Sequence, residues 1–165
     1  LNMSAMNVSR AVQELQELGL LETRKEGTSK IIKAVATGKE LYRLSSVYLQ
    51  SPVQKRIYVS LRNFDMNLPI AGETALAKKS LLNYPKCKVF AMDKKLLKNI
   101  PKEAIVEPKL MTGTDYVEIE LWKYDPSVYA FDDVVDIVSL VQSLKNVENE
   151  RIEIQVEEIM EEYKW

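Results

Sequence analysis

Hydrogen-bonding side chains are concentrated near the start of this chain, at Ser4, Asn7, Ser9, Arg10 and Gln13. These residue types can read the edges of DNA bases, because Arg pairs with guanine, Asn and Gln pair with adenine, and Ser hydrogen-bonds to either. Apolar residues recur between them at roughly helical spacing. The segment therefore predicts a helix whose polar side chains enter the major groove of DNA.

Basic side chains follow within residues 22–35, where Arg24, Lys25, Lys30 and Lys33 flank a turn. The turn residues are Glu26-Gly27-Thr28-Ser29, and the segments on either side have the character of strands. Cationic groups on a hairpin suit the DNA backbone, because they bind phosphate without reading the base sequence. The pattern predicts a basic hairpin beside the reading helix, as in the wing of a winged helix.

The reading helix needs an apolar stripe that holds it in place. Its expected members are Met3, Val8, Val12, Leu15 and Leu18, and we expect this stripe to face a core. Gly19 is well suited to end the helix, since glycine adopts the left-handed conformation without steric cost. An amphipathic helix followed by a hairpin is common in proteins of many functions, so this order alone does not establish DNA binding.

The segment as a whole resembles the winged-helix regulators of the MarR-like group. The resemblance runs from Val8 to Gly27, where a Ser-Arg pair leads into Leu-Gln-Glu-Leu-Gly-Leu-Leu and a charged hairpin. Downstream, Ala36-Thr37-Gly38-Lys39-Glu40-Leu41 resembles the entry into the next helix of that group. The resemblance implies a winged helix that binds DNA, and it does not specify the operator.

One departure from that group concerns the start of the pattern. A recognition helix normally follows other helices that brace it across the groove, whereas the helix here begins within the first few residues. We expect a truncated winged helix in a fragment of a longer protein, since Leu1 is not an initiator methionine. The alternative is that another segment of the chain supplies the support.

The composition is that of an ordinary folded protein, with 165 residues of which 46% are hydrophobic and 28% are charged. This length suits two small domains. The sequence has no apolar run long enough to span a membrane and no signal-peptide pattern. Its single cysteine, Cys87, cannot form an intrachain disulfide, and together these features predict a cytoplasmic protein.

The net charge of -1 conceals an uneven distribution along the chain. Residues 1–63 carry ten basic and five acidic side chains, whereas residues 115–165 carry four basic and fourteen acidic ones. Because phosphate attracts basic groups and repels acidic ones, we expect the N-terminal part to face DNA. For residues 148–162, a solvated acidic helix explains the charge without any partner.

A second domain is expected after Ser51-Pro52, where the proline should end a helix over residues 41–49. Expected strands lie at 55–61, 88–92, 105–106 and 116–122, expected helices lie at 71–82, 136–144 and 148–163, and Asp93 should cap a short helix. We therefore expect an α+β protein. Its predicted domains are a truncated winged helix over residues 1–50 and a mixed α/β regulatory or partner-binding domain over residues 51–165.

Several blocks of this second half also resemble a known group. The blocks are Gly72-Glu73-Thr74-Ala75-Leu76 and residues 117–126, 135–140 and 150–153. They resemble a bacterial group of MarR-family regulators that is distantly similar to AbiEi-type antitoxins, which join an N-terminal winged helix to a larger C-terminal domain. The resemblance implies a transcriptional regulator whose C-terminal domain takes an effector or a partner.

Catalysis finds little support in the sequence. The chain has no histidine and one cysteine, so a Ser-His or Cys-His nucleophile and a His/Cys zinc site cannot be built. Residues 72–80 echo a phosphate-binding loop, but Ala77 stands where the second glycine should be, and a plain helix is the simpler interpretation. We expect no enzyme and no cofactor.

Two sets of residues leave alternatives open. Asp125, Asp132, Asp133 and Asp136 could bind Mg²⁺ for nucleotidyl transfer, although Asp136 also suits a helix cap and Asp132-Asp133 suits a turn. The aromatic residues Trp122, Tyr124, Tyr129 and Phe131 could line a ligand pocket or belong to a core. Structural roles are the simpler interpretation in both cases, and no metal site is expected.

The sequence thus predicts a bacterial DNA-binding transcriptional regulator, most simply a repressor, that reads operator DNA with a recognition helix and a basic wing. The alternative is an AbiEi-like antitoxin that autoregulates its operon and neutralises a partner toxin. An enzyme acting through the Asp cluster is a third class. The expected partner is double-stranded DNA, a homodimer and a toxin protein are further candidates, and no membrane is involved.

Overall fold

The computed structural model describes residues 3–63, 66–107, 109 and 115–165, and it divides the chain into two compact units. One unit contains residues 1–49 together with Trp165, and the other contains residues 50–164. Helices and sheets occur in the chain together, which confirms the expected α+β class. None of the helices in the described part of the chain has the length and apolar character needed to cross a membrane.

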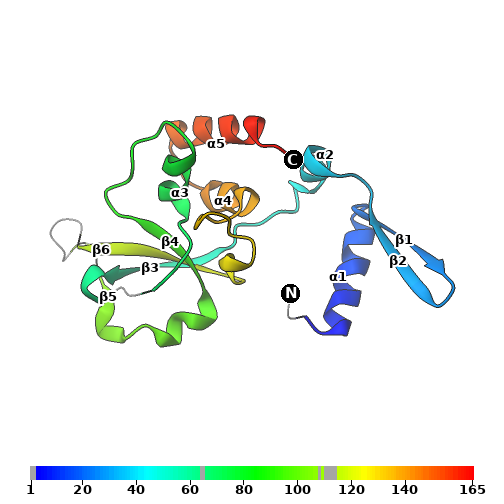
Figure 1. Cartoon of the computed structure of the whole chain (residues 1–165), viewed down its shortest axis with the longest axis horizontal. Helices are drawn as coiled ribbons and strands as arrows, with labels where there is room; N and C mark the ends of the chain where they lie inside the picture. The colour runs from blue at the N-terminus through cyan, green and yellow to red at the C-terminus, as the bar shows by residue number, and fades with distance from the viewer. Residues whose placement is uncertain (1–2, 64–65, 108, 110–114) are drawn as a thin grey trace. The chain divides into compact units, whose positions relative to one another are not determined.

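The N-terminal unit consists of a helix, a hairpin and a second helix, shown in Figure 1 as α1 (Ala5–Glu17), β1 (Leu21–Glu26), β2 (Ser29–Ala34) and α2 (Gly38–Ser45). Helix α1 begins where the Ser4 hydroxyl accepts a hydrogen bond from the Asn7 backbone N–H at 3.3 Å. It is followed by Gly19, whose φ of 71° is the left-handed conformation expected there. The predicted helix and hairpin are therefore confirmed.

The apolar stripe of α1 is mostly exposed, contrary to the expectation that it faces a core. Val12 is buried, whereas Met3, Val8, Leu15 and Leu18 retain 36% to 45% of their exposure. The reason is that α1 contacts the hairpin along one side, where Gln16 and Thr23 are hydrogen-bonded. A two-stranded hairpin is too narrow to cover a stripe this wide. The prediction of a wholly core-facing stripe was wrong for four of its five members.

Helix α2 is also displaced from its expected position at residues 41–49. It spans Gly38–Ser45, and its last turn closes with a hydrogen bond from the Ser46 N–H to the Tyr42 carbonyl at 2.8 Å. The end of this helix was predicted from Pro52, but a proline sets only the latest residue at which a helix can end. The helix therefore ends before the proline requires it to.

The C-terminal unit contains a four-stranded mixed sheet in the order β4-β6-β3-β5 (Figure 1). The strands are β3 (Val53–Ser60), β4 (Val89–Asp93), β5 (Ile105–Val106) and β6 (Tyr116–Trp122). Strand β6 runs antiparallel to β3 and parallel to β4, and β3 and β5 are antiparallel. All four strands lie at or within a few residues of their predicted positions.

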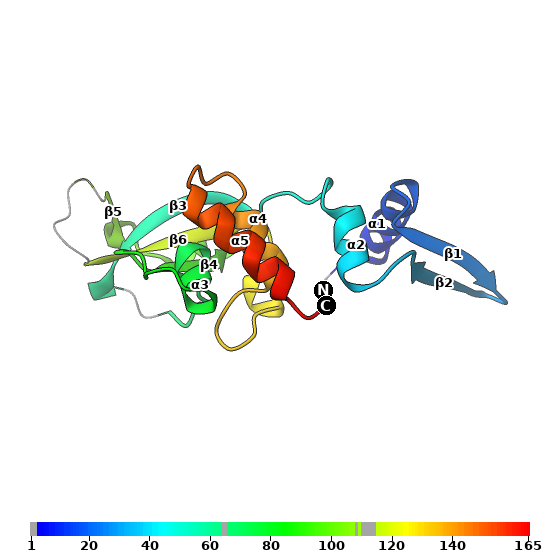
Figure 2. The ribbon, with the colours of Figure 1, turned by 90° about the horizontal axis from the view of Figure 1, so that it is seen from above.

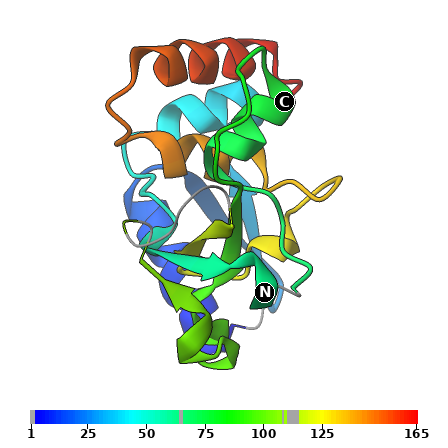
Figure 3. The same cartoon turned by 90° about the vertical axis from the view of Figure 1, so that its left-hand side faces the viewer.

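Helices α3 (Gly72–Lys79), α4 (Ile137–Leu144) and α5 (Glu150–Glu162) cover one face of this sheet. Figures 2 and 3 show α3 and α4 next to the sheet and α5 lying over them. The opposite side carries a short 3-10 helix, Lys94–Asn99, which Asp93 caps by accepting the Lys95 N–H at 2.9 Å. The predicted helices and the Asp93 cap are confirmed.

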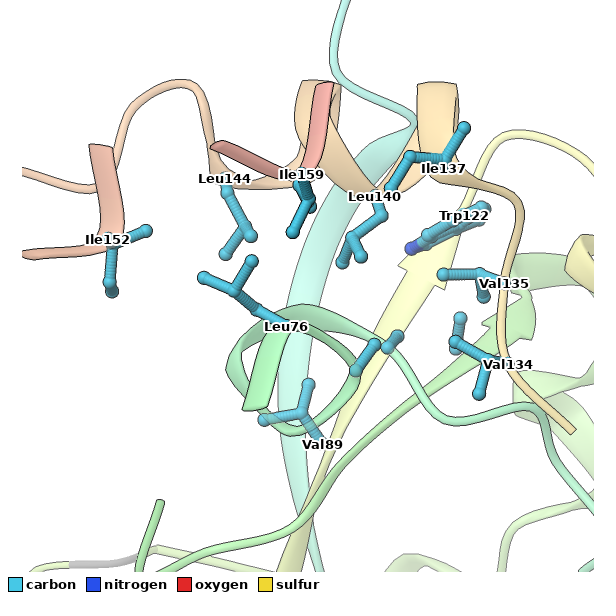
Figure 4. Packing of buried hydrophobic residues seen from close by; sticks show 13 residues of the cluster. Leu76, Val89, Trp122, Val134, Val135, Ile137, Leu140, Leu144, Ile152 and Ile159 are labelled. Carbon is cyan, nitrogen blue, oxygen red and sulfur yellow. The ribbon is translucent and has the colours of Figure 1, made fainter. Parts of the chain in front are cut away.

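Both faces of the sheet bury apolar side chains. On the helix-covered face, Trp122 and Val89 pack with Leu76, Leu140 and Ile159 from the three helices (Figure 4). The opposite face is lined by a second cluster that contains Ile57, Val59, Val117, Ile119 and Leu121. Because neighbouring residues of a strand point to opposite faces, β6 is buried on both sides.

Candidate functional site

The polar face of α1 remains open. Asn7, Ser9 and Arg10 are exposed and make no side-chain hydrogen bond or ion pair with any residue that the structure describes. With 3.6 residues per turn, Arg10 lies about 160° around the helix from the buried Val12. Gln13 is exposed as well, but its Nε2 donates to Glu17 at 3.0 Å. Three of the five predicted reading residues are therefore exposed and unpartnered among the described residues. Asn7 and Arg10 lie about 60° apart on the outer side of α1, whereas Ser9 lies about 60° from Val12.

Ser4 caps the start of α1, and its predicted base contact stays a prediction. Its hydroxyl accepts the Asn7 backbone N–H and caps the first turn of α1. A serine at this position satisfies a backbone donor that would otherwise lack a partner. Ser4 therefore holds the start of the helix.

The four basic residues of the hairpin do not form one surface. In the antiparallel register Lys25 pairs with Lys30, Arg24 pairs with Ile31, and Lys33 pairs with Glu22. Since side chains alternate between the two faces of a strand, Lys25 and Lys30 share one face while Arg24 and Lys33 lie on the other.

The two faces of the hairpin differ in electrostatic balance. Arg24 lies 3.8 Å from Glu26, and both side chains are largely exposed, so the charge on its face is partly neutralised. Lys25 and Lys30 form no ion pair with any described residue. Like charges directly opposite each other destabilise a strand pair, and an anion bound between them would relieve that repulsion.

The unpaired lysines and the helix lie on the same side of the hairpin. Thr23 shares a face with Lys25 because the two are separated by one residue, and the Thr23 hydroxyl donates to Gln16 of α1 at 3.2 Å. The face that carries Lys25 and Lys30 is therefore the face that α1 packs against. Helix α1 and the lysine pair thus lie on one side of the hairpin, whereas Arg24 and Lys33 lie on the other side. The outer side of α1, which carries Arg10, points away from the hairpin.

The candidate metal residues in the C-terminal unit have structural roles. Asp136 caps α4 by accepting a backbone N–H at 2.9 Å, and Asp125 caps a short 3-10 helix in the same way. Asp132 and Asp133 form a turn with φ angles of 52° and 59°. These positions confirm the cap and the turn. The described residues contain no group of three or more His, Cys, Asp or Glu side chains arranged to hold a metal ion.

The four aromatic residues of the predicted pocket do not form a single cluster. Trp122 is fully buried and contacts Tyr124 with ring centroids 5.6 Å apart, whereas Phe131 is 83% exposed. Tyr129 is exposed as well. The segment that echoed a phosphate-binding loop is the plain helix α3, which confirms the simpler interpretation.

A partly buried charge cluster on the sheet escaped the sequence analysis. Arg56 of β3 pairs in register with Glu120 of β6, and its Nη2 lies 3.0 Å from Glu120 Oε1. The Nε atom of Arg56 lies 3.1 Å from Glu118 Oε1. Trp122 completes the cluster by donating its Nε1–H to Glu120 Oε2 at 3.0 Å. One guanidinium thus serves two carboxylates on the helix-covered face.

Burial determines the electrostatics of this cluster. The Glu120 side chain is 1% exposed, and burial raises its pKa while the hydrogen bond from Trp122 and the charge of Arg56 act against that rise. Burial likewise raises the pKa of Glu118, again opposed by Arg56. Two carboxylates therefore share one guanidinium in this part of the molecule.

A hollow of about 230 Å³ opens beside the cluster and is lined in part by Arg56, Gly72, Glu73, Glu118 and Glu120. A second hollow of about 210 Å³ shares Arg56 and Val147 with the first and is lined further by Lys55 and Asn146, among others. Arg56 therefore lines both hollows.

A sequence signal for the cluster existed in the strand Val-Glu-Ile-Glu-Leu-Trp. Val117, Ile119 and Leu121 alternate with Glu118 and Glu120, a pattern that predicts one apolar and one polar face. Trp122, on the same face as the glutamates, was the signal that this face is covered as well, so that a carboxylate beside it needs a partner. The identity of that partner depends on the register of β3 against β6, which the sequence does not state.

Comparison of the chain with protein-family models, with curated proteins and with solved structures yields no match. The functional argument therefore depends on the geometry of the residues themselves.

Proposed function

We propose that this chain is a DNA-binding transcriptional regulator whose residues 1–49 form the DNA-contacting unit. The observation that carries the proposal is that α1, with Asn7 and Arg10 exposed on its outer side, and the unpaired Lys25 and Lys30 lie on the same side of the hairpin. This side offers hydrogen-bonding groups for base edges and cations for phosphates. A DNA interface needs both kinds of contact.

The dimensions of α1 fit this role. Its thirteen residues give a helix about 20 Å long, and the major groove of DNA admits a helix. Arg10 would contact guanine, Asn7 would contact adenine, and Ser9 would serve either base. Lys25 and Lys30 would contact the phosphate backbone and thereby fix the register of the helix on the duplex.

The charge of the remaining chain supports one orientation on DNA. Residues 115–165 carry fourteen acidic and four basic side chains, so phosphates repel this segment. The acidic segment would therefore face away from the duplex, where it is available to a regulatory ligand or a protein partner. Repression is the simplest outcome of such binding, because a protein on an operator excludes other proteins from the same DNA.

The proposal is tested by selecting duplexes that the chain enriches from a random library and by measuring their binding by fluorescence anisotropy. Arg10→Ala should cost about 1 to 3 kcal/mol on the enriched sequence and much less on a scrambled one. Arg62→Ala is the matched control, because Arg62 is exposed and lies in the other unit. The absence of any enriched sequence, or an equal loss on both duplexes, would contradict the proposal.

A second candidate function, the antitoxin, is favoured by the turn at Asp132-Asp133. Val128, Tyr129 and Phe131 precede this turn and are all more than half exposed, with Phe131 at 83%. Exposed aromatic side chains beside acidic ones suit a protein partner with an apolar recess and a basic rim. Co-expression with the product of the neighbouring gene tests this function. Phe131→Ser should abolish co-purification, and co-purification that survives Phe131→Ser would count against it.

A further inference from the structure

The base of the hairpin is joined to α1 by backbone hydrogen bonds. The Leu20 N–H donates to the Leu15 carbonyl at 2.9 Å, and the Val35 N–H donates to the Leu20 carbonyl at 3.1 Å. Leu20 is 5% exposed, and Val12 of α1 is buried as well. These contacts determine where the hairpin starts, and the direction in which its tip extends depends on contacts farther along the strands.

The hairpin needs such contacts, because two strands alone have little stability of their own. Helix α1 packs against β1, whereas Ile32 of β2 remains 45% exposed. The tip of the hairpin extends away from α1 (Figures 1 and 2). The position of Lys25 and Lys30, which pair with each other near that tip, therefore depends on how β1 is held against the helix.

One side-chain hydrogen bond joins α1 to the hairpin among the residues that the structure describes. The Thr23 hydroxyl donates to Gln16 Oε1 at 3.2 Å. Thr23 is half-buried, although its neighbours Glu22 and Arg24 are exposed. Gln16 lies about 40° around the helix from the buried Val12, on the side that meets the hairpin.

This contact lies between the two groups that would meet DNA. Along β1, Thr23 precedes Lys25 by two residues, which is about 7 Å of strand. Along α1, Arg10 precedes Gln16 by six residues, which is about 9 Å of helix. A change of angle at the contact of Gln16 with Thr23 would therefore displace Lys25 relative to Arg10.

We propose that the Gln16–Thr23 hydrogen bond sets the angle between the reading helix and the hairpin, which makes these two residues positioning residues of the DNA-contacting unit. Phosphate contacts fix the register of a protein on a duplex. With the angle held, Lys25 and Lys30 bind phosphates in the register at which Arg10 reaches a base edge. The inference rests on the proposed function and assigns part of its sequence specificity to this contact.

The test is Thr23→Val in the full chain, because valine removes the hydroxyl and keeps a β-branched side chain suited to a strand. Affinity for the enriched duplex should fall about threefold, within the range that loss of one hydrogen bond produces, while affinity for the scrambled duplex should change little. The slope of log affinity against log salt should stay the same, since the lysines still contact phosphates. Loss of folding would instead weaken binding to both duplexes.

Two further variants of the pair examine the hydrogen bond itself. Thr23→Ser keeps the hydroxyl and should retain the preference for the enriched duplex. The double variant Gln16→Leu/Thr23→Val should lose no more than either single variant, because both substitutions remove the same contact. Thr37→Val is the matched control, since Thr37 is exposed in the same unit and its side chain caps no helix.

A measurement without DNA tests the contact independently. Thr23→Val should increase amide hydrogen exchange across residues 22–33 about threefold, because the hairpin opens more often once the hydrogen bond is lost. Thr37→Val should leave that exchange unchanged.

Three results would overturn the inference and leave the proposed function standing. The first is that Thr23→Val keeps the wild-type preference for the enriched duplex while Arg10→Ala loses it. The second is an equal loss on both duplexes, which would assign Thr23 to folding alone. The third is unchanged hydrogen exchange in the hairpin of Thr23→Val. If no duplex is enriched at all, the proposed function fails and this inference fails with it, so the two failures are distinguishable.

Discussion

Arg56 and Glu120 stand opposite each other across the antiparallel β3–β6 pair, with the guanidinium Nη2 3.0 Å from a carboxylate oxygen of a side chain that is 1% exposed. A buried ion pair stabilises a fold little compared with a well-packed apolar pair, but the loss of one partner leaves a charge without compensation. Removal of either residue should therefore destabilise the fold more than removal of both.

The first prediction follows from this dependence. Arg56→Met should lower the free energy of unfolding by about 1 to 3 kcal/mol, because the buried Glu120 would keep only the hydrogen bond from Trp122, while the 41% exposure of Arg56 limits the loss. The double variant Arg56→Met/Glu120→Gln should regain much of that loss, since Gln is neutral and keeps an oxygen for the Trp122 N–H. Urea unfolding followed by circular dichroism measures both, and Arg62→Met controls for removal of an exposed arginine. A double variant no more stable than Arg56→Met would show that the pair is not coupled.

The second prediction concerns the pH dependence that Glu118 introduces. Burial raises its pKa above the ordinary 4.5 in the folded chain, so the folded state retains a proton at pH values where the unfolded chain has lost it. The folded state is then penalised at high pH, and the penalty disappears as the pH falls through the raised pKa toward 4.5. Wild type should therefore gain stability relative to Glu118→Gln when the pH is lowered from about 7 to about 5.

The measurement for Glu118 is the difference between the unfolding free energies of wild type and variant at each pH, because the pH dependence of the groups that do not interact with Glu118 cancels in that difference. Glu103→Gln provides the corresponding difference for an exposed carboxylate. A difference for Glu118→Gln that stays constant with pH, or that moves in the opposite direction, would refute the assigned shift.

Periodicity explains which parts of this molecule the sequence could predict. The strand over Tyr116–Trp122 and the helix over Ala5–Glu17 follow from local patterns, since a period of two or 3.6 residues depends only on neighbours in the chain. The contact of Arg56 with Glu120 joins residues 64 positions apart. It depends on strand register, which the packing of the whole sheet decides.

In the hairpin, by contrast, the distribution of the basic residues between the two faces could have been predicted from the sequence. Strand alternation separates Arg24 from Lys25, and the turn at residues 26–29 fixes which residues of the second strand lie opposite them. The exposure of the α1 stripe could not be predicted in this way, because burial depends on the element packed against the helix. Local pattern gives the face, and tertiary packing decides whether that face is covered.

The third prediction concerns the turn at Asp132-Asp133. Phe131 and Val134 exchange both backbone hydrogen bonds, at 2.9 and 3.1 Å, and the two residues between them have positive φ angles. This is the type I′ arrangement, in which glycine is favoured at the second central position. Asp133→Gly should raise the free energy of unfolding by about 0.5 to 1 kcal/mol, because it relieves the left-handed strain at that residue. Asp133→Ala removes the same charge without relieving the strain, so equal stability of the two variants by urea unfolding would rule out this explanation.

The last prediction distinguishes the two faces of the hairpin. Lys25 and Lys30 lie opposite each other on the α1 side without an ion pair among the described residues, while Arg24 and Lys33 share the other face with Glu22 and Glu26. Lys25→Ala or Lys30→Ala should weaken binding to every duplex and reduce the slope of log affinity against log salt by about 0.9, because one fewer counterion is released. Lys33→Ala should leave that slope nearly unchanged. Fluorescence anisotropy between about 50 and 200 mM salt provides the slopes. If Lys33→Ala reduced the slope as much as Lys25→Ala did, the face behind the hairpin would have to contact DNA as well, and the assignment of the interface to the α1 side would be wrong.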